Sequence, residues 1–148
     1  APMTEYVFDT EPIIAYFYDE PGASEVTEEL EAIEGGTATG AIAHATAVEI
    51  VYKIARLETG DPNKIPPGDD EFETGTQDLR VLRGFGVTVE TPSWRTVARI
   101  KGPGGISLGD SYAAALALEK DATLVIGADP EFGELSVDLH IHQIRDDA

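Results

Sequence analysis

Four acidic residues lie in apolar segments, where a buried charge is costly unless a cation neutralises it. Asp9 and Asp129 each follow a short apolar run. Glu49 lies inside another such run, and Asp110 precedes an alanine-rich stretch. Carboxylate oxygens are the preferred ligands of hard divalent cations. The placement of these four acids therefore indicates a metal site assembled from four separate segments.

Each of these acids also has a simpler structural explanation. Glu49 follows Thr46 by three residues and Asp110 follows Ser107 by three, so both fit a capping box at a helix start. The other two acids fit ordinary turns. Carboxylates brought together without a cation, however, raise one another's pKa. Sequence spacing alone leaves capping and metal binding as alternatives.

The elements that must position these acids alternate between strands and helices. Apolar residues spaced three and four apart predict helices, and short apolar or alternating runs predict strands. Alternation of this kind favours an α/β fold, with a mostly parallel five-stranded sheet covered by helices on both faces. The predicted strands are 6–8, 37–43, 87–90, 122–127 and 137–144, and the predicted helices are 12–18, 24–34, 46–57, 77–83, 93–102 and 107–120.

This topology predicts that the four acids share one edge of the sheet. In a parallel sheet the carboxyl ends of the strands and the first turns of the following helices lie along the same edge, where ligands bind. Asp9 and Asp129 follow strands, whereas Glu49 and Asp110 are expected in first turns of helices. We therefore expect the four carboxylates to converge.

Length and composition set limits on the protein class. The 148 residues suit one domain, expected at 3–148, with Ala1-Pro2 a cloning remnant and 59–76 a long acidic loop. No apolar run reaches the roughly 20 residues that span a bilayer, so we expect no membrane segment. The absence of cysteine and of P-loop or G-x-S-x-G motifs disfavours thiolate metal sites and covalent catalysis.

The net charge is −18, from 28 acidic and 10 basic residues. Intrinsic disorder does not fit, because 42% of the chain is hydrophobic. A surface that binds polycations is one alternative. The interpretation we favour is an extreme halophile, since concentrated salt screens the repulsion between acidic side chains.

The few basic residues fall in pairs. Lys53 and Arg56 follow Glu49 by four and seven residues, and Arg95 and Arg99 form a similar pair. Lys53 can simply pair with Glu49 along the helix. Alternatively, these four cations contact the anionic backbone of a substrate.

Several segments together resemble the PIN-domain nucleases, and most closely the VapC-type toxins of toxin–antitoxin pairs. The resemblance rests on residues 7–10 (VFDT), the helix containing Glu49, residues 106–117 (ISLGDSYAAALA) and residues 124–132 (LVIGADPEF). It covers residues 3–135. The stretch from Ser107 to Phe132 is its most specific part.

The resemblance implies a PIN-like three-layer α/β/α sandwich that hydrolyses RNA phosphodiester bonds with Mg²⁺ or Mn²⁺. Catalytic and metal-binding roles carry over to Asp9, Glu49, Asp110 and Asp129. Thr10 matches a hydroxyl residue that supports the site. Ala128 is an insertion before Asp129, so Glu131 is a further candidate ligand.

The resemblance also implies partners, and there are alternatives to it. It implies an RNA substrate, a homodimer and a small VapB-type antitoxin. The absence of cysteine is compatible with a reducing cytoplasm, where we expect the protein. One alternative is a PIN nuclease of RNA processing or ribosome maturation without an antitoxin. Another is a non-catalytic halophilic binding module. A phosphatase of the HAD type needs an aspartate where this chain has Glu11, which counts against that class.

Overall fold

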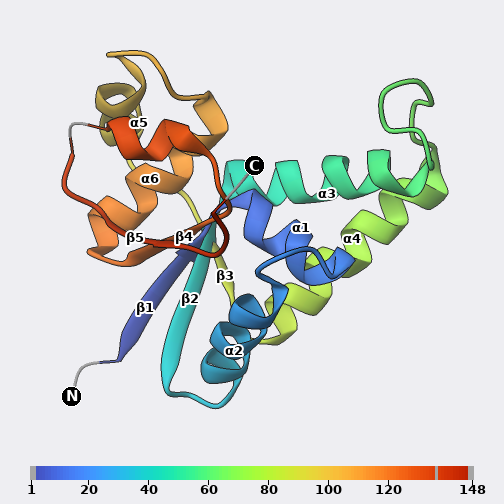
Figure 1. Cartoon of the computed structure of the whole chain (residues 1–148), viewed down its shortest axis with the longest axis horizontal. Helices are drawn as coiled ribbons and strands as arrows, with labels where there is room; N and C mark the ends of the chain where they lie inside the picture. The colour runs from blue at the N-terminus through green and yellow to red at the C-terminus, as the bar shows by residue number, and fades with distance from the viewer. Residues whose placement is uncertain (1–2, 136, 147–148) are drawn as a thin grey trace.

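The computed structural model describes residues 3–135 and 137–146, so the expectation for Ala1-Pro2 lies outside the described residues. Five strands form one sheet in the order β3-β2-β1-β4-β5, and every neighbouring pair is parallel. The predicted α/β class is confirmed, and the sheet is parallel throughout (Figure 1). The elements are β1 (Thr4–Phe8), α1 (Thr10–Tyr18), α2 (Ala23–Glu34), β2 (Ala38–Ala43), α3 (His44–Glu58), α4 (Asp69–Gly84), β3 (Thr88–Glu90), α5 (Trp94–Lys101), α6 (Leu108–Lys120), β4 (Thr123–Ile126), the 3-10 turn η1 (Pro130–Glu134) and β5 (His140–Gln143).

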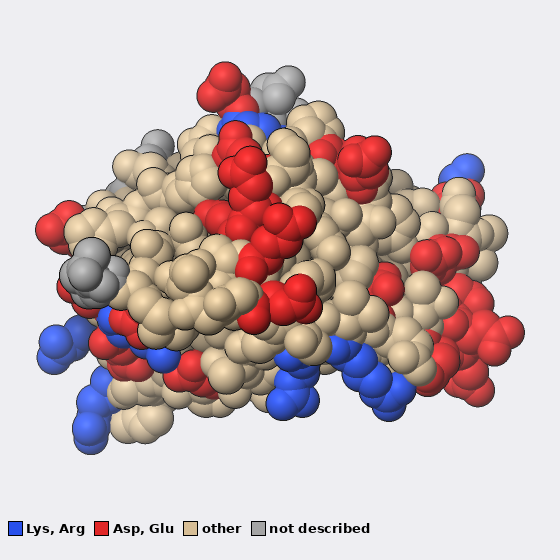
Figure 2. Space-filling model, turned by 90° about the horizontal axis from the view of Figure 1, so that it is seen from below, with Lys and Arg blue, Asp and Glu red and all other residues tan. Residues whose placement is uncertain are grey.

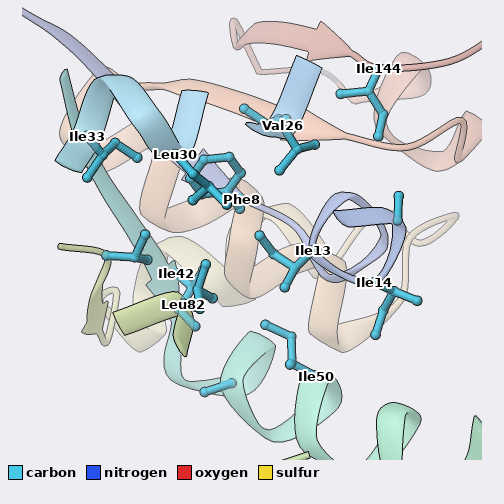
Figure 3. Packing of buried hydrophobic residues seen from close by; sticks show 14 of the residues in the cluster. Phe8, Ile13, Ile14, Val26, Leu30, Ile33, Ile42, Ile50, Leu82 and Ile144 are labelled. Carbon is cyan, nitrogen blue, oxygen red and sulfur yellow. The ribbon is translucent and has the colours of Figure 1, made fainter. Parts of the chain in front are cut away.

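Side chains that alternate along the strands supply two separate cores. Phe8 of β1, Ile42 of β2 and Val125 of β4 point toward the helices α1 to α4. Their neighbours Val7 and Leu124 point toward α5 and α6. Successive strand residues face opposite sides of a sheet, so a sheet with two apolar faces needs helices on both. The result is the three-layer sandwich. Figure 3 shows Phe8 among isoleucine and leucine side chains of the core between the sheet and helices α1 to α4.

The strand order places a topological switch point between β1 and β4. From β1 the chain proceeds to β2 and β3 on one side, and it later returns to β4 and β5 on the other. The loops that leave β1 and β4 therefore diverge at the carboxyl edge of the sheet, the place where ligands of open α/β sheets bind. Asp9 follows β1 and Asp129 follows β4. The switch point thus lies between two of the predicted site residues.

Two predicted boundaries differ from the structure by three residues or more, each for a physical reason. The acidic loop ends at Gly68, because α4 begins at Asp69 rather than at Gln77. Acidic residues in its first turn suit the positive end of a helix, and Glu71 Oε1 accepts the Gly68 N–H at 3.0 Å. The last strand is His140–Gln143 rather than 137–144, since Val137 and Leu139 pack against the α5–α6 core instead of joining the sheet.

The charged residues of the chain are mostly acidic, 28 against 10 basic residues. Figure 2 shows acidic side chains in several clusters across one face, with basic side chains gathered mainly toward its lower margin. The charge excess is thus dispersed over that face rather than collected in one patch.

Dilution of salt should therefore destabilise the protein. The Debye length grows from about 3 Å at 1 M salt to about 30 Å at 0.01 M, so repulsion among the acids strengthens. We expect the melting temperature to fall as KCl is lowered from molar to tens of millimolar concentration, measured by differential scanning fluorimetry. A melting temperature that is constant or rises on dilution contradicts the halophilic hypothesis.

In the described part of the chain, no helix has the length and apolarity needed to cross a bilayer.

Candidate metal centre

Three carboxylates meet at the carboxyl edge of the sheet. Oxygens of Asp110, Asp129 and Glu131 all lie within 4.8 Å of one another. Asp110 comes from the first turn of α6 and is 9% exposed, whereas the other two lie just after β4. Asp129 Oδ1 accepts the Glu131 N–H at 2.9 Å, which holds the two residues in one turn. Glu131, the additional candidate from the sequence, is therefore part of the central group.

Asp9 lies beside this group and is almost fully buried. It is 3% exposed, and its Oδ1 has no hydrogen-bond partner among the described residues. Burial raises the pKa of Asp9 to about 7, and the charges of Glu49 and Asp129 add to the rise. A buried carboxylate oxygen without a partner is costly, and a bound cation would supply the missing interaction.

Burial also raises the pKa of Asp110 far above its ordinary value. Hydrogen bonding with Glu131 and the charges of Asp9 and Asp129 act in the same direction. Carboxylates this close cannot all be ionised unless a positive charge joins them. The electrostatics of the metal-free site therefore favour either bound protons or a bound cation.

Glu49 reaches the site from α3, but not from its first turn as predicted. The helix begins at His44, directly after β2, so Glu49 lies in the second turn. Its Oε1 accepts the Thr10 hydroxyl at 3.0 Å. A Cβ atom at Gly109 would lie 2.7 Å from both Glu49 oxygens, so this carboxylate packs directly against the first turn of α6. Gly109 is a site residue that sequence reasoning missed; its only signal is a glycine next to Asp110.

The capping alternatives have different outcomes. Thr46 does not cap α3, since it lies within the helix, is fully buried and has no partner for its hydroxyl among the described residues. Ser107 does cap α6, because its Oγ accepts the Asp110 N–H at 3.2 Å. That bond uses the Asp110 backbone and leaves its carboxylate facing Asp129 and Glu131. The cap and the carboxylate group therefore coexist.

The donor set fits a hard divalent cation. It offers three carboxylates within 4.8 Å and, beside them, a buried Asp9 oxygen without a partner in the described part of the chain. Oxygen ligands of this kind suit Mg²⁺, Mn²⁺ or Ca²⁺ rather than softer metals. Asp110, Asp129 and Glu131 can hold one ion, with Asp9 adjacent to it.

The four candidate cations are arranged unequally. Lys53 lies beside the site, with Nζ 4.0 Å from Glu49 Oε2. The Arg56 guanidinium stacks on the Tyr52 ring, 4.7 Å from its centroid, and Arg95 stacks on Trp94 at 4.8 Å. Arg99 is exposed in the last turn of α5. Only Lys53 has a described contact with a site carboxylate.

Stability of the metal-free protein should fall as pH rises. Unfolded aspartates titrate near pH 4, whereas the folded protein retains the Asp9 proton up to about pH 7. The folded state thus binds more protons in this window, so its free energy of unfolding decreases with rising pH, by roughly 1–3 kcal/mol between pH 5 and 7.5. Urea titrations with a chelator present measure this difference.

A divalent cation should reverse that loss, because it replaces the protons. Burial lowers the pKa of His142, but Glu29 and Glu25 raise it by more, so its pKa lies above the ordinary value. The contribution of protonated His142 to the stability of the protein is therefore also lost as pH rises. Addition of Mn²⁺ separates the two contributions, because His142 lies outside the carboxylate group. Equal stabilisation by Mn²⁺ at pH 5 and pH 7.5 would contradict the interpretation.

Comparison with known proteins adds a family and a set of similar folds. The family model described as PIN domain matches residues 6–137. No curated protein sequence matches the chain.

Three solved structures share the fold at low sequence identity. VapBC2 from Rickettsia felis, bound to a DNA fragment from its promoter, matches with a TM-score of 0.67 and 16% identity over 95% of this chain and 98% of that chain. VapBC-1 from nontypeable Haemophilus influenzae matches with a TM-score of 0.63 and 18% identity over 95% and 98%. PAE2754 from Pyrobaculum aerophilum matches with a TM-score of 0.56 and 20% identity over 86% and 82%.

Proposed function

The chain belongs to the PIN domain family, and from that premise we propose that it is a metal-dependent endoribonuclease and the toxin of a VapBC-type pair. The observation that carries the proposal is the group formed by Asp110, Asp129 and Glu131 beside buried Asp9. Such a group is expensive to maintain without a cation. Its position at the switch point of a parallel sheet is where substrates of α/β proteins bind.

The residues divide the work of hydrolysis. Asp9, Asp110, Asp129 and Glu131 would hold Mg²⁺ or Mn²⁺, and the bound ion would lower the pKa of an attacking water and stabilise charge on the leaving oxygen. Thr10 orients Glu49 through its 3.0 Å hydrogen bond. The Glu49 carboxylate packs against Gly109 and so forms the side of the site next to α6.

A cavity beside the site supports RNA as the substrate. A cavity of about 420 Å³ opens beside Glu49 and is lined also by His44, Val48, Leu108 and Tyr112. The apolar side chains and the Tyr112 ring suit the face of a base, since stacking on such groups tolerates any sequence. Lys53 lies 4.0 Å from Glu49, which lines the cavity, and offers a positive charge to a phosphate. We assign weaker roles to Arg56, which follows Lys53 on α3, and to Arg95 and Arg99, which lie on α5.

A basic partner suits a site with this charge. Two of the similar structures are VapBC assemblies. We therefore propose that this chain forms a homodimer in the cytoplasm and pairs with a small antitoxin. A lysine or arginine of that antitoxin would enter the carboxylate group, and its positive charge would take the place of the metal ion.

The test is cleavage of a mixed-sequence RNA by purified protein with Mg²⁺ or Mn²⁺, with a chelator and with Ca²⁺ in parallel. We expect cleavage with the first two ions and none with chelator. The molar mass of the protein in the same preparation should be that of a dimer. If no RNA is cleaved with either ion although Mn²⁺ raises the melting temperature, the protein is a metal-binding module rather than a nuclease. Cleavage by a monomer that co-purifies with no small partner would favour RNA processing over a toxin.

A further inference from the structure

Glu11 links α1 to the loop that carries Asp129. It lies in the first turn of α1, two residues after Asp9. Its Oε2 accepts the Ala128 N–H at 3.3 Å. The loop approaches so closely that a Cβ atom at Gly127 would collide with the Glu11 carboxyl group. Glycine at position 127 is thus required for the carboxylate to reach the backbone of the loop.

Arg145 fixes the other oxygen of Glu11. The Arg145 Nη2 group donates to Glu11 Oε1, and its Nη1 group contacts Glu20 Oε1 at 3.4 Å and the Pro21 carbonyl at 3.3 Å. Both partners of the ion pair are largely shielded, with 16% of the Arg145 side chain and 29% of the Glu11 side chain exposed. Arg145 follows β5, whose end is paired to β4 through the Ile144 N–H and the Ile126 carbonyl at 3.0 Å.

These contacts join three segments around the metal centre. Asp9 precedes α1, Asp129 and Glu131 follow β4, and Arg145 comes from the end of the chain. β1 and β4 are already paired through their backbones, and the Asp9 N–H donates to the Val125 carbonyl at 2.9 Å. Beyond Ile126, however, the loop leaves the sheet. Its described link back to the Asp9 side is the Glu11 carboxylate.

We propose that Glu11 and Arg145 are positioning residues that set the place of Asp129 and Glu131 relative to Asp9. The inference rests on the proposed metal-dependent function. Neither residue holds the metal. Glu11 has one oxygen on Arg145 and the other on Ala128, so this acid is withheld from the carboxylate group although it starts two residues from Asp9. Contacts behind the ligands tune metal sites in this way.

The charge of Arg145 has a second effect. Without it, Glu11 would add a negative charge beside carboxylates that already repel one another. The freed Glu11 side chain would also compete for the cation. Loss of Arg145 should therefore weaken metal binding, even though Arg145 contacts none of the proposed metal ligands.

The experiment measures Mn²⁺ affinity by thermal-shift titration, together with kcat and KM for RNA. Glu11→Ala should weaken Mn²⁺ binding by about tenfold or more, the usual range for contacts behind metal ligands. Its kcat should fall and its KM should change little. Glu11→Gln keeps an acceptor for the Ala128 N–H but loses the ion pair, so its loss should be smaller. Arg145→Gln should weaken Mn²⁺ binding as well.

Glu20→Gln is the matched control. It removes another carboxylate from the same arginine without touching the loop, so Mn²⁺ affinity should equal that of the parent. If Glu11→Ala lowers the melting temperature but binds Mn²⁺ as the parent does, the pair is only structural and the inference fails. If Glu11→Ala does not fold, the inference also fails when both Glu11→Gln and Arg145→Gln show the parent's affinity and kcat.

The outcomes separate this inference from the nuclease proposal. A parent that binds Mn²⁺ but cleaves no RNA, with weaker binding in Glu11→Ala, refutes the nuclease and retains the positioning role. If the parent cleaves RNA and Glu11→Ala binds Mn²⁺ with unchanged affinity, the nuclease proposal is retained and the positioning role is refuted. A parent that binds no divalent cation refutes both.

Discussion

Replacement of Asp110 by asparagine should abolish metal-dependent RNA cleavage while the fold survives. Asp110 belongs to the central carboxylate group, and the substitution removes one negative charge from it. The cap of α6 persists, because Ser107 accepts the backbone N–H of residue 110 and not its side chain. We expect kcat to drop by about 100-fold or more, the scale seen when one preorganised electrostatic contact is lost from an active site. Steady-state cleavage assays with Mn²⁺ measure the change.

The stability of metal-free Asp110→Asn, unlike its activity, should not fall. Asparagine resembles the protonated aspartic acid that the raised pKa of Asp110 favours, so repulsion is relieved. The chelated variant should melt at or above the temperature of the chelated parent, and Mn²⁺ should stabilise it less.

Asp121→Asn is the matched control at the other end of the same helix. Asp121 is exposed and has a φ of 51°, a conformation that asparagine tolerates. This variant should cleave as the parent does. Full activity in Asp110→Asn would remove Asp110 from the metal site, whereas equal losses in both variants would indicate a general defect of α6.

The convergence of the site was predictable because it follows from topology. Alternation of strands and helices implies a parallel sheet, and a parallel sheet gathers its strand ends at one edge. Asp9, Asp110 and Asp129 follow that rule, and it requires no knowledge of how their side chains are oriented. Glu49 arrives at the same edge from the second turn of α3 rather than the first.

The start of α3 shows why local signals misplace helix ends. Thr46 is a good capping residue by type, but β2 runs directly into the helix at Ala43 and leaves Thr46 inside it. The acidic run at residues 69–71 is a similar case. Its charge suggests a solvated segment, yet the same charges stabilise the beginning of α4.

Contacts between distant segments were beyond sequence reasoning. Glu11 meets Ala128 across 117 positions and Arg145 across 134. Neither side chain has a local pattern that identifies its partner. Glycines at close approaches pose the same problem, since the sequence records a glycine but not what lies against it.

Gly75→Ala should destabilise the protein, although alanine is the better helix former. Gly75 lies inside α4, where that helix crosses α3. A Cβ atom there would lie 2.5 Å from the Val51 carbonyl oxygen and 3.1 Å from its Cα. Backbone atoms cannot rotate away, so α3 and α4 must separate. Overpacking of this kind costs about 1–3 kcal/mol, or roughly 2–4 °C in Tm for each kcal/mol in a domain of this size.

The displacement should also reach the candidate metal centre, because Val51 is two residues from Glu49 on α3. Cleavage by Gly75→Ala should fall, as Glu49 moves away from Thr10 and Gly109. Thermal melts and kcat of the same preparation measure the two effects.

Gly84→Ala supplies the control in the same helix. Gly84 is the last residue of α4, and a Cβ atom there would meet no described atom within 4 Å. Alanine should therefore stabilise the protein slightly, by about 0.5–1 kcal/mol, because it restricts the unfolded chain. Opposite signs for the two substitutions would establish that the close contact with Val51, and not helix propensity, decides the result. A gain in stability from Gly75→Ala would mean that α3 and α4 adjust freely, and Glu49 would then not depend on their spacing.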